Sequence, residues 1–213
     1  MKRHCYFFRV LLVVLLRVCP SPAASALEET KDGTDRWTRE NYERVLDLVF
    51  QDRCTAPTDA RWVSCVRIIP AFKDEMEYSL SLGRRYDGTL LARVTRPKSQ
   101  SVYVQLRELK KEHPHGSVND LSKMIKVESQ SVDQLRFPAL VALANEFENI
   151  RFSPALSDEV MMDATEYRFC VRSFSGDSMA LTLHGPGPAA PRQPQGLIQW
   201  AESAREVLTG AFK

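Results

Sequence analysis

The chain has 213 residues, of which 44% are hydrophobic and 26% are charged, with 29 basic against 27 acidic side chains. These proportions exclude a disordered tail, a collagen and a membrane protein with several spans, because each of those classes has a composition far from the globular average. The length allows one domain, or at most two small ones.

The first 26 residues have the pattern of a secretory signal peptide. A basic start is followed by the apolar run at 10–16 and by small residues up to Ala26. The run is too short to span a bilayer as a helix, which needs about 20 apolar residues. A lipid anchor on Cys19 is disfavoured by the bulky Val18 before it. We expect cleavage between Ala26 and Leu27.

The expected division is a signal peptide at 1–26, a flexible polar lead-in at 27–36 and a single domain over 37–213. Removal of the signal takes away four basic residues and no acid, so the formal net charge changes from +2 to slightly negative. A near-neutral mature chain gives no reason to expect nucleic acid as a partner. We also expect no membrane span after the signal is removed.

The first half of the mature chain predicts one helix and then three strands. Apolar residues recur at helical spacing from Thr38 until about Arg53. Trp, Val and Ile residues mark a strand at 61–69, and apolar and polar residues alternate at 76–82. After Tyr86-Asp87-Gly88, a three-residue hairpin loop with Gly88 in the left-handed region sets Leu82 opposite Ala92, which keeps the apolar residues on one face.

The second half predicts helices, a hairpin and a final helix. Helices are expected at 102–109, where an alternating strand pattern also fits, at 117–126 with Met124 inward, and at 134–150 with Leu135 inward. A second hairpin pairs 167–172 with 179–183, a Pro- and Gly-rich loop covers 185–196, and a helix covers 197–208. This order predicts an α+β fold in which one antiparallel sheet of about five strands, a three-strand run and a C-terminal hairpin, is packed by helices mainly on one face.

Three cysteines remain in the mature chain. Cys54 and Cys65 are close in sequence, and an oxidising compartment would favour a bridge between them that closes a short loop. Cys170 would then be left in an apolar strand, either as an inert thiol or as half of an intermolecular bridge. No Cys-x-x-Cys pair is present, so the sequence indicates neither a thioredoxin-like site nor a zinc ribbon.

No catalytic motif or cofactor-binding loop is found in the sequence, and no cofactor is expected. A hydrolase would have to use His113, His115 or His184 as its base. In an extended His113-Pro114-His115 segment both rings point the same way and could meet one metal, with His184 or Glu112 as a third ligand. The alternative is a solvated loop after a helix.

Arginines gather near the two hairpins. The candidates for an anion-binding or partner-binding surface are Arg84, Arg93, Arg168 and Arg172. Because successive strand residues point to opposite faces, Arg168 and Arg172 are expected opposite Tyr167, Phe169 and Val171. The alternative is that neighbouring carboxylates across the strands occupy these arginines.

The sequence therefore predicts an exported domain, periplasmic or secreted, that is not an enzyme and that binds a protein or a cell-envelope component. The alternative is an exported hydrolase or metal-dependent enzyme that uses His113, His115 or His184. A deep pocket lined by one of these histidines would favour the enzyme. An open sheet face without a cleft would favour the binding domain.

Overall fold

The structure is a computed structural model that describes residues 22–50, 60–132, 134–150, 164–173, 178–185 and 195–212. The chain divides into two units, Met1–Gly33 and Thr34–Lys213. In the first unit, residues 22–33 are helical and form the beginning of α1. The fold and the candidate site described below belong to the second unit.

The described elements are five α-helices, six strands and one short 3-10 helix. In chain order they are α1 (Pro22–Phe50), β1 (Ala60–Ile69), β2 (Tyr78–Arg85), β3 (Leu90–Pro97), α2 (Val102–Glu112), α3 (Val118–Met124), β4 (Val127–Val132), α4 (Ala139–Asn149), β5 (Glu166–Ser173), β6 (Ser178–His184), α5 (Gln195–Thr209) and η1 (Gly210–Phe212). The strands form a single antiparallel sheet in the order β4-β3-β2-β1-β5-β6. The predicted α+β class with an antiparallel sheet is confirmed.

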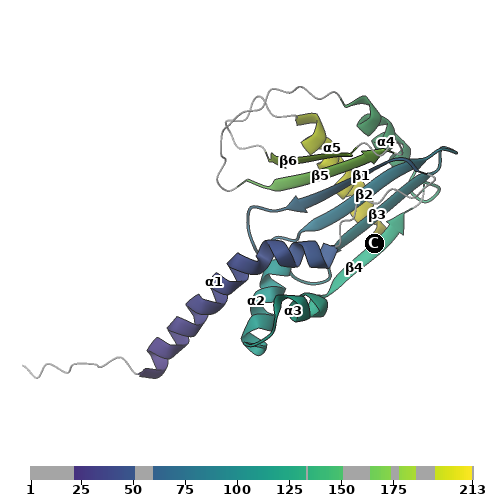
Figure 1. The fold of residues 1–213 in the computed structure, drawn as a ribbon. Coiled ribbons are helices and arrows are strands. Elements are labelled where there is room, and N and C mark those ends of the chain that lie inside the picture. Colours follow the sequence, from purple (N-terminus) through teal and green to yellow (C-terminus); the bar gives the residue numbers. More distant parts are fainter. Residues whose placement is uncertain are drawn as a thin grey trace, which may run out of the picture. The chain divides into compact units, whose positions relative to one another are not determined.

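One face of the sheet, called here the inner face, carries the main hydrophobic core. Alternate residues of the strands, such as Val66, Leu80, Val94 and Phe169, are almost completely buried there. Helices α4 and α5 contribute the other half of this core, including Trp200 with 1% exposure. Figure 1 shows these two helices behind the sheet. Burial of large aromatic and aliphatic side chains at this interface is the main stabilising contribution to the domain.

A second, smaller core lies between α1, α2 and α3. Its buried residues are Tyr42, Val45, Leu46, Phe50, Ile69, Val102, Leu106, Leu121 and Ile125. The helical spacing of the α1 residues explains this packing, because positions three and four apart share one face of a helix. Ile69 at the end of β1 belongs to this core, so it joins the helices to the sheet.

The β2–β3 hairpin has the predicted register. Leu80 is opposite Val94 and Leu82 is opposite Ala92. Gly88 has φ +87°, and the Arg85 N–H donates to the Thr89 carbonyl at 2.9 Å. The three-residue loop is therefore confirmed, because only this loop keeps the apolar side chains of both strands on the inner face.

Two elements differ from the prediction at their beginnings. α1 begins at Pro22 rather than at Thr38, so the segment 27–36 that we expected to be a lead-in is helical. Alanines precede this segment and Leu27, Glu28 and Glu29 begin it, and these residue types favour helices. α4 begins at Ala139 with Pro138 as its N-cap, so Leu135 lies outside the helix and is 89% exposed rather than inward.

The strand count is six rather than about five. The additional strand is β4, whose sequence Val-Glu-Ser-Gln-Ser-Val shows no apolar alternation and of which only Val132 is buried. An edge strand with polar residues on both faces gives no period-two signal, which is why the pattern missed it. Met124, expected inward, is 43% exposed at the end of α3.

Candidate functional site

The face of the sheet opposite the α4–α5 core is called here the outer face. Its composition follows from the strand register and from the alternation of side chains. It carries Val63, Cys65 and Arg67 on β1; Ser79, Ser81, Gly83 and Arg85 on β2; Leu91, Arg93 and Thr95 on β3; Ser129 and Ser131 on β4; Glu166, Arg168, Cys170 and Arg172 on β5; and Ser178, Ala180, Thr182 and His184 on β6. Most of these side chains are small, and the charged ones are mainly arginines.

The charged strand residues of the outer face are mainly basic. They include five arginines (Arg67, Arg85, Arg93, Arg168 and Arg172) and one carboxylate, Glu166. The expected placement of Arg168 and Arg172 is confirmed, since Tyr167 and Phe169 are buried in the core on the other face. The outer face is therefore suited to interact with negatively charged groups.

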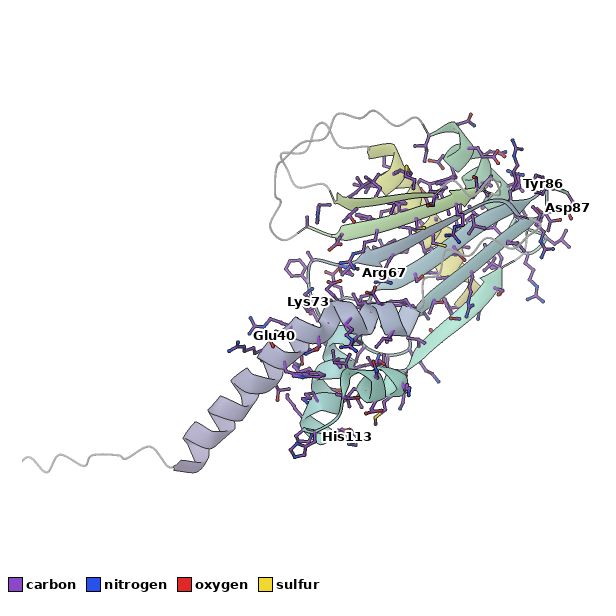
Figure 2. All side chains as sticks on the ribbon, viewed as in Figure 1. Glu40, Arg67, Lys73, Tyr86, Asp87 and His113 are labelled. Carbon is purple, nitrogen blue, oxygen red and sulfur yellow. The ribbon has the colours of Figure 1, made fainter. Side chains whose placement is uncertain are left out.

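Arg67 and Arg168 are engaged by carboxylates within the protein. Arg67 and Arg168 are opposite each other on β1 and β5. Arg67 donates to Asp47 of α1 at 2.8 Å, and Arg168 pairs with Glu43 of α1 at 2.6 Å and with Glu166 at 2.5 Å. Figure 2 shows Arg67 on the outer face beside α1. The carboxylates one helical turn apart on α1 thus neutralise two adjacent cations.

The electrostatics of Arg168 agree with this arrangement. Partial burial lowers the pKa of Arg168, but the hydrogen bonds to Glu166 and Glu43 outweigh that effect and the pKa is raised. The guanidinium therefore stays charged and paired. Sequence reasoning did not single out Arg67, Glu43 or Asp47. The signal that could have pointed to Glu43 and Asp47 is their spacing of four residues on the polar side of a predicted helix.

Arg93 and Arg172 differ from this pair. Both are exposed, and neither forms an ion pair with any residue that the structure describes. Arg93 is opposite Ser81 on one side and Ser131 on the other, and Arg172 is opposite Val63 and Ser178. Within the described strands, the neighbours of both guanidinium groups are therefore neutral.

Arg84, the fourth predicted arginine, lies on the inner face. It donates to Glu148 at 2.9 Å and to Asn145 at 2.9 Å, both on α4. Glu148 also accepts from the Trp62 indole N–H at 2.7 Å. Slight burial acts to raise the pKa of Glu148. The hydrogen bond from Trp62 and the charge of Arg84 outweigh this effect, so the pKa lies below the usual value of a glutamate. Arg84 thus attaches α4 to the sheet and is not part of the outer face.

A groove opens next to this contact. Its volume is about 710 Å³, and its lining residues include Trp62, Phe147, Glu148, Ile150, Val171 and Met179. Its one carboxylate is already engaged by Trp62 and Arg84. None of the three histidines lines it.

The three histidines lie in two different places in the fold. His113 and His115 are exposed in the loop between α2 and α3, and Figure 2 shows His113 at the end of α2 away from the sheet. His184 ends the edge strand β6, where it is opposite Glu166. Within the described ranges, no group of three His, Cys, Asp or Glu side chains is arranged to hold a metal ion.

The cysteines have an arrangement that the sequence did not reveal. Cys54 lies outside the described residues, so the predicted Cys54–Cys65 bridge stays a prediction. Cys65 on β1 is directly opposite Cys170 on β5, and the two side chains pack together with Val63. Both are thiols in the structure.

No protein-family model, curated protein or solved structure matches this chain. In the part of the chain that the structure describes, no helix has the length and apolar character needed to cross a membrane. The function is therefore inferred from the outer face itself.

Proposed function

We propose that this protein is an exported, non-enzymatic binding domain whose outer sheet face binds a protein partner that presents carboxylates. The observation that carries the proposal is the exposure of Arg93 and Arg172 on a face whose strand residues are otherwise mostly small and neutral. Exposed arginines can form bidentate pairs with carboxylates, and a basic surface accelerates encounter with an acidic partner.

The spacing of the two arginines favours an extended partner. Arg93 is on β3 and Arg172 is on β5, so three inter-strand steps separate their strands, which corresponds to about 14 Å. One phosphate or one carboxylate cannot bridge that span. A protein surface with several acidic side chains can contact both, and the small residues between them allow close approach.

The paired arginines support the same chemistry. Arg67 and Arg168 hold two carboxylates of α1 at 2.8 Å and 2.6 Å. The outer face therefore already binds one acidic surface, that of α1, through guanidinium groups. The proposed partner would use Arg93 and Arg172 in the same way.

The experiment compares binding of a fluorescent polyglutamate peptide to the protein and to two double variants. R93Q/R172Q removes the two exposed charges of the outer face. R39Q/R44Q, at two exposed positions of α1, removes the same net charge elsewhere and is the matched control. We expect R93Q/R172Q to weaken binding about tenfold, or about 1.4 kcal/mol, at low salt, with R39Q/R44Q close to the parent.

Binding should also weaken as salt is added, since exposed charge pairs are screened. Equal affinity of the two double variants would overturn the assignment to the outer face. Unchanged thermal stability of R93Q/R172Q would show that the loss of binding does not come from unfolding.

Export is tested independently. We propose that the signal at 1–26 is removed and that the mature chain begins at Leu27. The intact mass of secreted material should correspond to a chain beginning at or near that residue. A soluble cytosolic product that retains Met1 to Ala26 would contradict export without affecting the binding proposal.

A further inference from the structure

Cys65 and Cys170 form a cross-strand cysteine pair at the centre of the outer face. The register of β1 and β5 places them directly opposite each other. They lie in one row across the sheet, with Ser81 next to Cys65 and Ala180 next to Cys170. The side chain of Cys170 packs against a small buried cluster formed by Cys65 and Val63.

The register places the two Cα atoms within the range of separations that disulfides join. Residues directly opposite in an antiparallel pair have Cα atoms about 4.5 or 5.5 Å apart, depending on the hydrogen-bonding pattern. Disulfides usually join Cα atoms about 4.4–6.8 Å apart, so both kinds of position fall in range. The two side chains also point to the same face, since the opposite residues of a pair share a side of the sheet.

Access to the pair is asymmetric. Cys65 is 9% exposed, whereas Cys170 is half-buried on β5, next to the edge strand β6. Its neighbour toward the edge, Ala180, is exposed and small. A small oxidant therefore reaches the sulfur of Cys170 before that of Cys65.

We propose that Cys65 and Cys170 form a disulfide across β1 and β5 when the protein meets a low-molecular-weight disulfide such as oxidised glutathione. The Cys170 thiol loses its proton to solvent, and its thiolate attacks one sulfur of glutathione disulfide. A mixed disulfide forms, and one glutathione thiolate leaves. The Cys65 thiolate then attacks the Cys170 sulfur of the mixed disulfide and releases the second glutathione. Two protein thiols are oxidised, and one glutathione disulfide is reduced to two glutathione thiols.

The proposal does not depend on the function proposed for the outer face. It competes with the Cys54–Cys65 bridge predicted from sequence, because Cys65 can join only one partner. The Cys65–Cys170 bridge closes a much longer loop, and in the chain-entropy model a longer loop gives the larger stabilisation.

The test uses the full chain, the C54S variant and the C65S variant, each incubated with oxidised glutathione and then alkylated. Peptide mapping without reductant should find the Cys65–Cys170 link in the full chain and in C54S. In C65S, which has lost the resolving thiol, Cys170 should carry glutathione. C170S is the matched control, in which the buried Cys65 should capture glutathione at least tenfold more slowly.

Two results would overturn the proposal. One is a Cys54–Cys65 link in the full chain, with Cys170 alkylated. The other is alkylation of both Cys65 and Cys170 in C54S, after an exposure to the oxidant that fully oxidises an unfolded control of the same chain. Mapping of the full chain and of C54S decides the outcome even where C65S or C170S fails to fold.

Discussion

Tyr42 of α1 donates its phenolic hydrogen to the carboxylate of Glu77, which precedes β2, and both side chains are buried. The other carboxylate oxygen of Glu77 accepts from the Val102 N–H at 2.8 Å, at the start of α2. One buried acid thus connects α1, β2 and the N-terminal end of α2. The helix dipole favours a negative group at that end. The three elements are held together by this carboxylate as well as by apolar packing.

Replacement of Glu77 by alanine should lower the free energy of unfolding by about 3 kcal/mol, because it leaves the Tyr42 hydroxyl and the Val102 N–H buried without their acceptor. Urea denaturation measures the change. The matched control is E75A, two residues earlier and exposed, which should change the stability by less than about 0.5 kcal/mol. Similar losses in both variants would contradict a special role for Glu77.

The stability of the fold should depend on pH through the same residue. Burial raises the pKa of Glu77, although hydrogen bonds from Tyr42 and Val102 oppose the shift. As the pH rises from about 4.5, the unfolded chain loses this proton first while the folded protein keeps it. The contribution of Glu77 to stability is therefore fully present below the ordinary glutamate pKa and is lost as the pH passes the raised value.

The measurement is a series of urea denaturations between pH 4 and pH 8 for the parent and for E77Q. The parent should lose stability relative to E77Q as the pH increases across this range, because glutamine does not titrate. Parallel pH profiles for the two proteins would show that Glu77 has the same pKa in the folded and unfolded states.

Gly88 should be intolerant of a side chain. Its φ of +87° is in the left-handed region, and alanine there should cost about 1–2 kcal/mol. The control is G196A in α5, where alanine favours the helix and, beyond the adjacent helix backbone, no heavy atom of the described residues lies within 4 Å of the added Cβ. G88A should lower the melting temperature, whereas G196A should raise it slightly. The same sign for both variants would contradict the turn conformation.

Replacement of Ser64 by alanine should make the protein more stable. Its side chain is 0% exposed in the middle of β1, between Leu82 and Val171, and its hydroxyl makes no hydrogen bond with the residues described. An unpaired buried hydroxyl costs about 1 kcal/mol or more, so S64A should raise the urea midpoint. S81A on the outer face of β2 is the control and should have little effect. A clear loss of stability in S64A would show that the hydroxyl has a partner.

Arg67 should contribute more to stability than Arg93. Arg67 is 7% exposed, donates to Asp47 at 2.8 Å and lies over the Phe50 ring at 5.9 Å. R67Q should cost about 2 kcal/mol, since it removes a charged hydrogen bond and the cation–π contact. R93Q should cost less than about 1 kcal/mol in the same urea titration. Equal costs would contradict the division into paired and available arginines.

The parts of the fold that the sequence predicts are those with a strong local period. The β2–β3 register followed from apolar alternation and from the turn residues, because a slip of one residue would turn Leu80 and Leu82 to the wrong face. The β4 strand lacked such a period, since its residues are mostly exposed. Leu135 was misplaced because apolar spacing continues across Pro138, where the helix begins.

The candidate site was predictable only in part, because some contacts of its side chains are with elements that are distant in sequence. Strand alternation assigned Arg168 and Arg172 to one face. The partners of Arg168 and Arg84 come from α1 and α4, which are distant in sequence and meet the strands only in the folded protein. The opposition of Cys65 and Cys170 likewise depends on the pairing of β1 with β5, which no local pattern encodes.

That pairing also has a consequence for how the chain folds. β1 is at the centre of the sheet, with its near neighbour β2 on one side and β5, from the last third of the sequence, on the other. The backbone hydrogen bonds on one side of β1 therefore form only when β5, which is far away in the sequence, pairs with it. Topologies that depend on contacts between distant parts of the sequence fold slowly. During synthesis the first four strands emerge before β5, so the open edge of β1 is available for incorrect strand pairing until the C-terminal hairpin arrives.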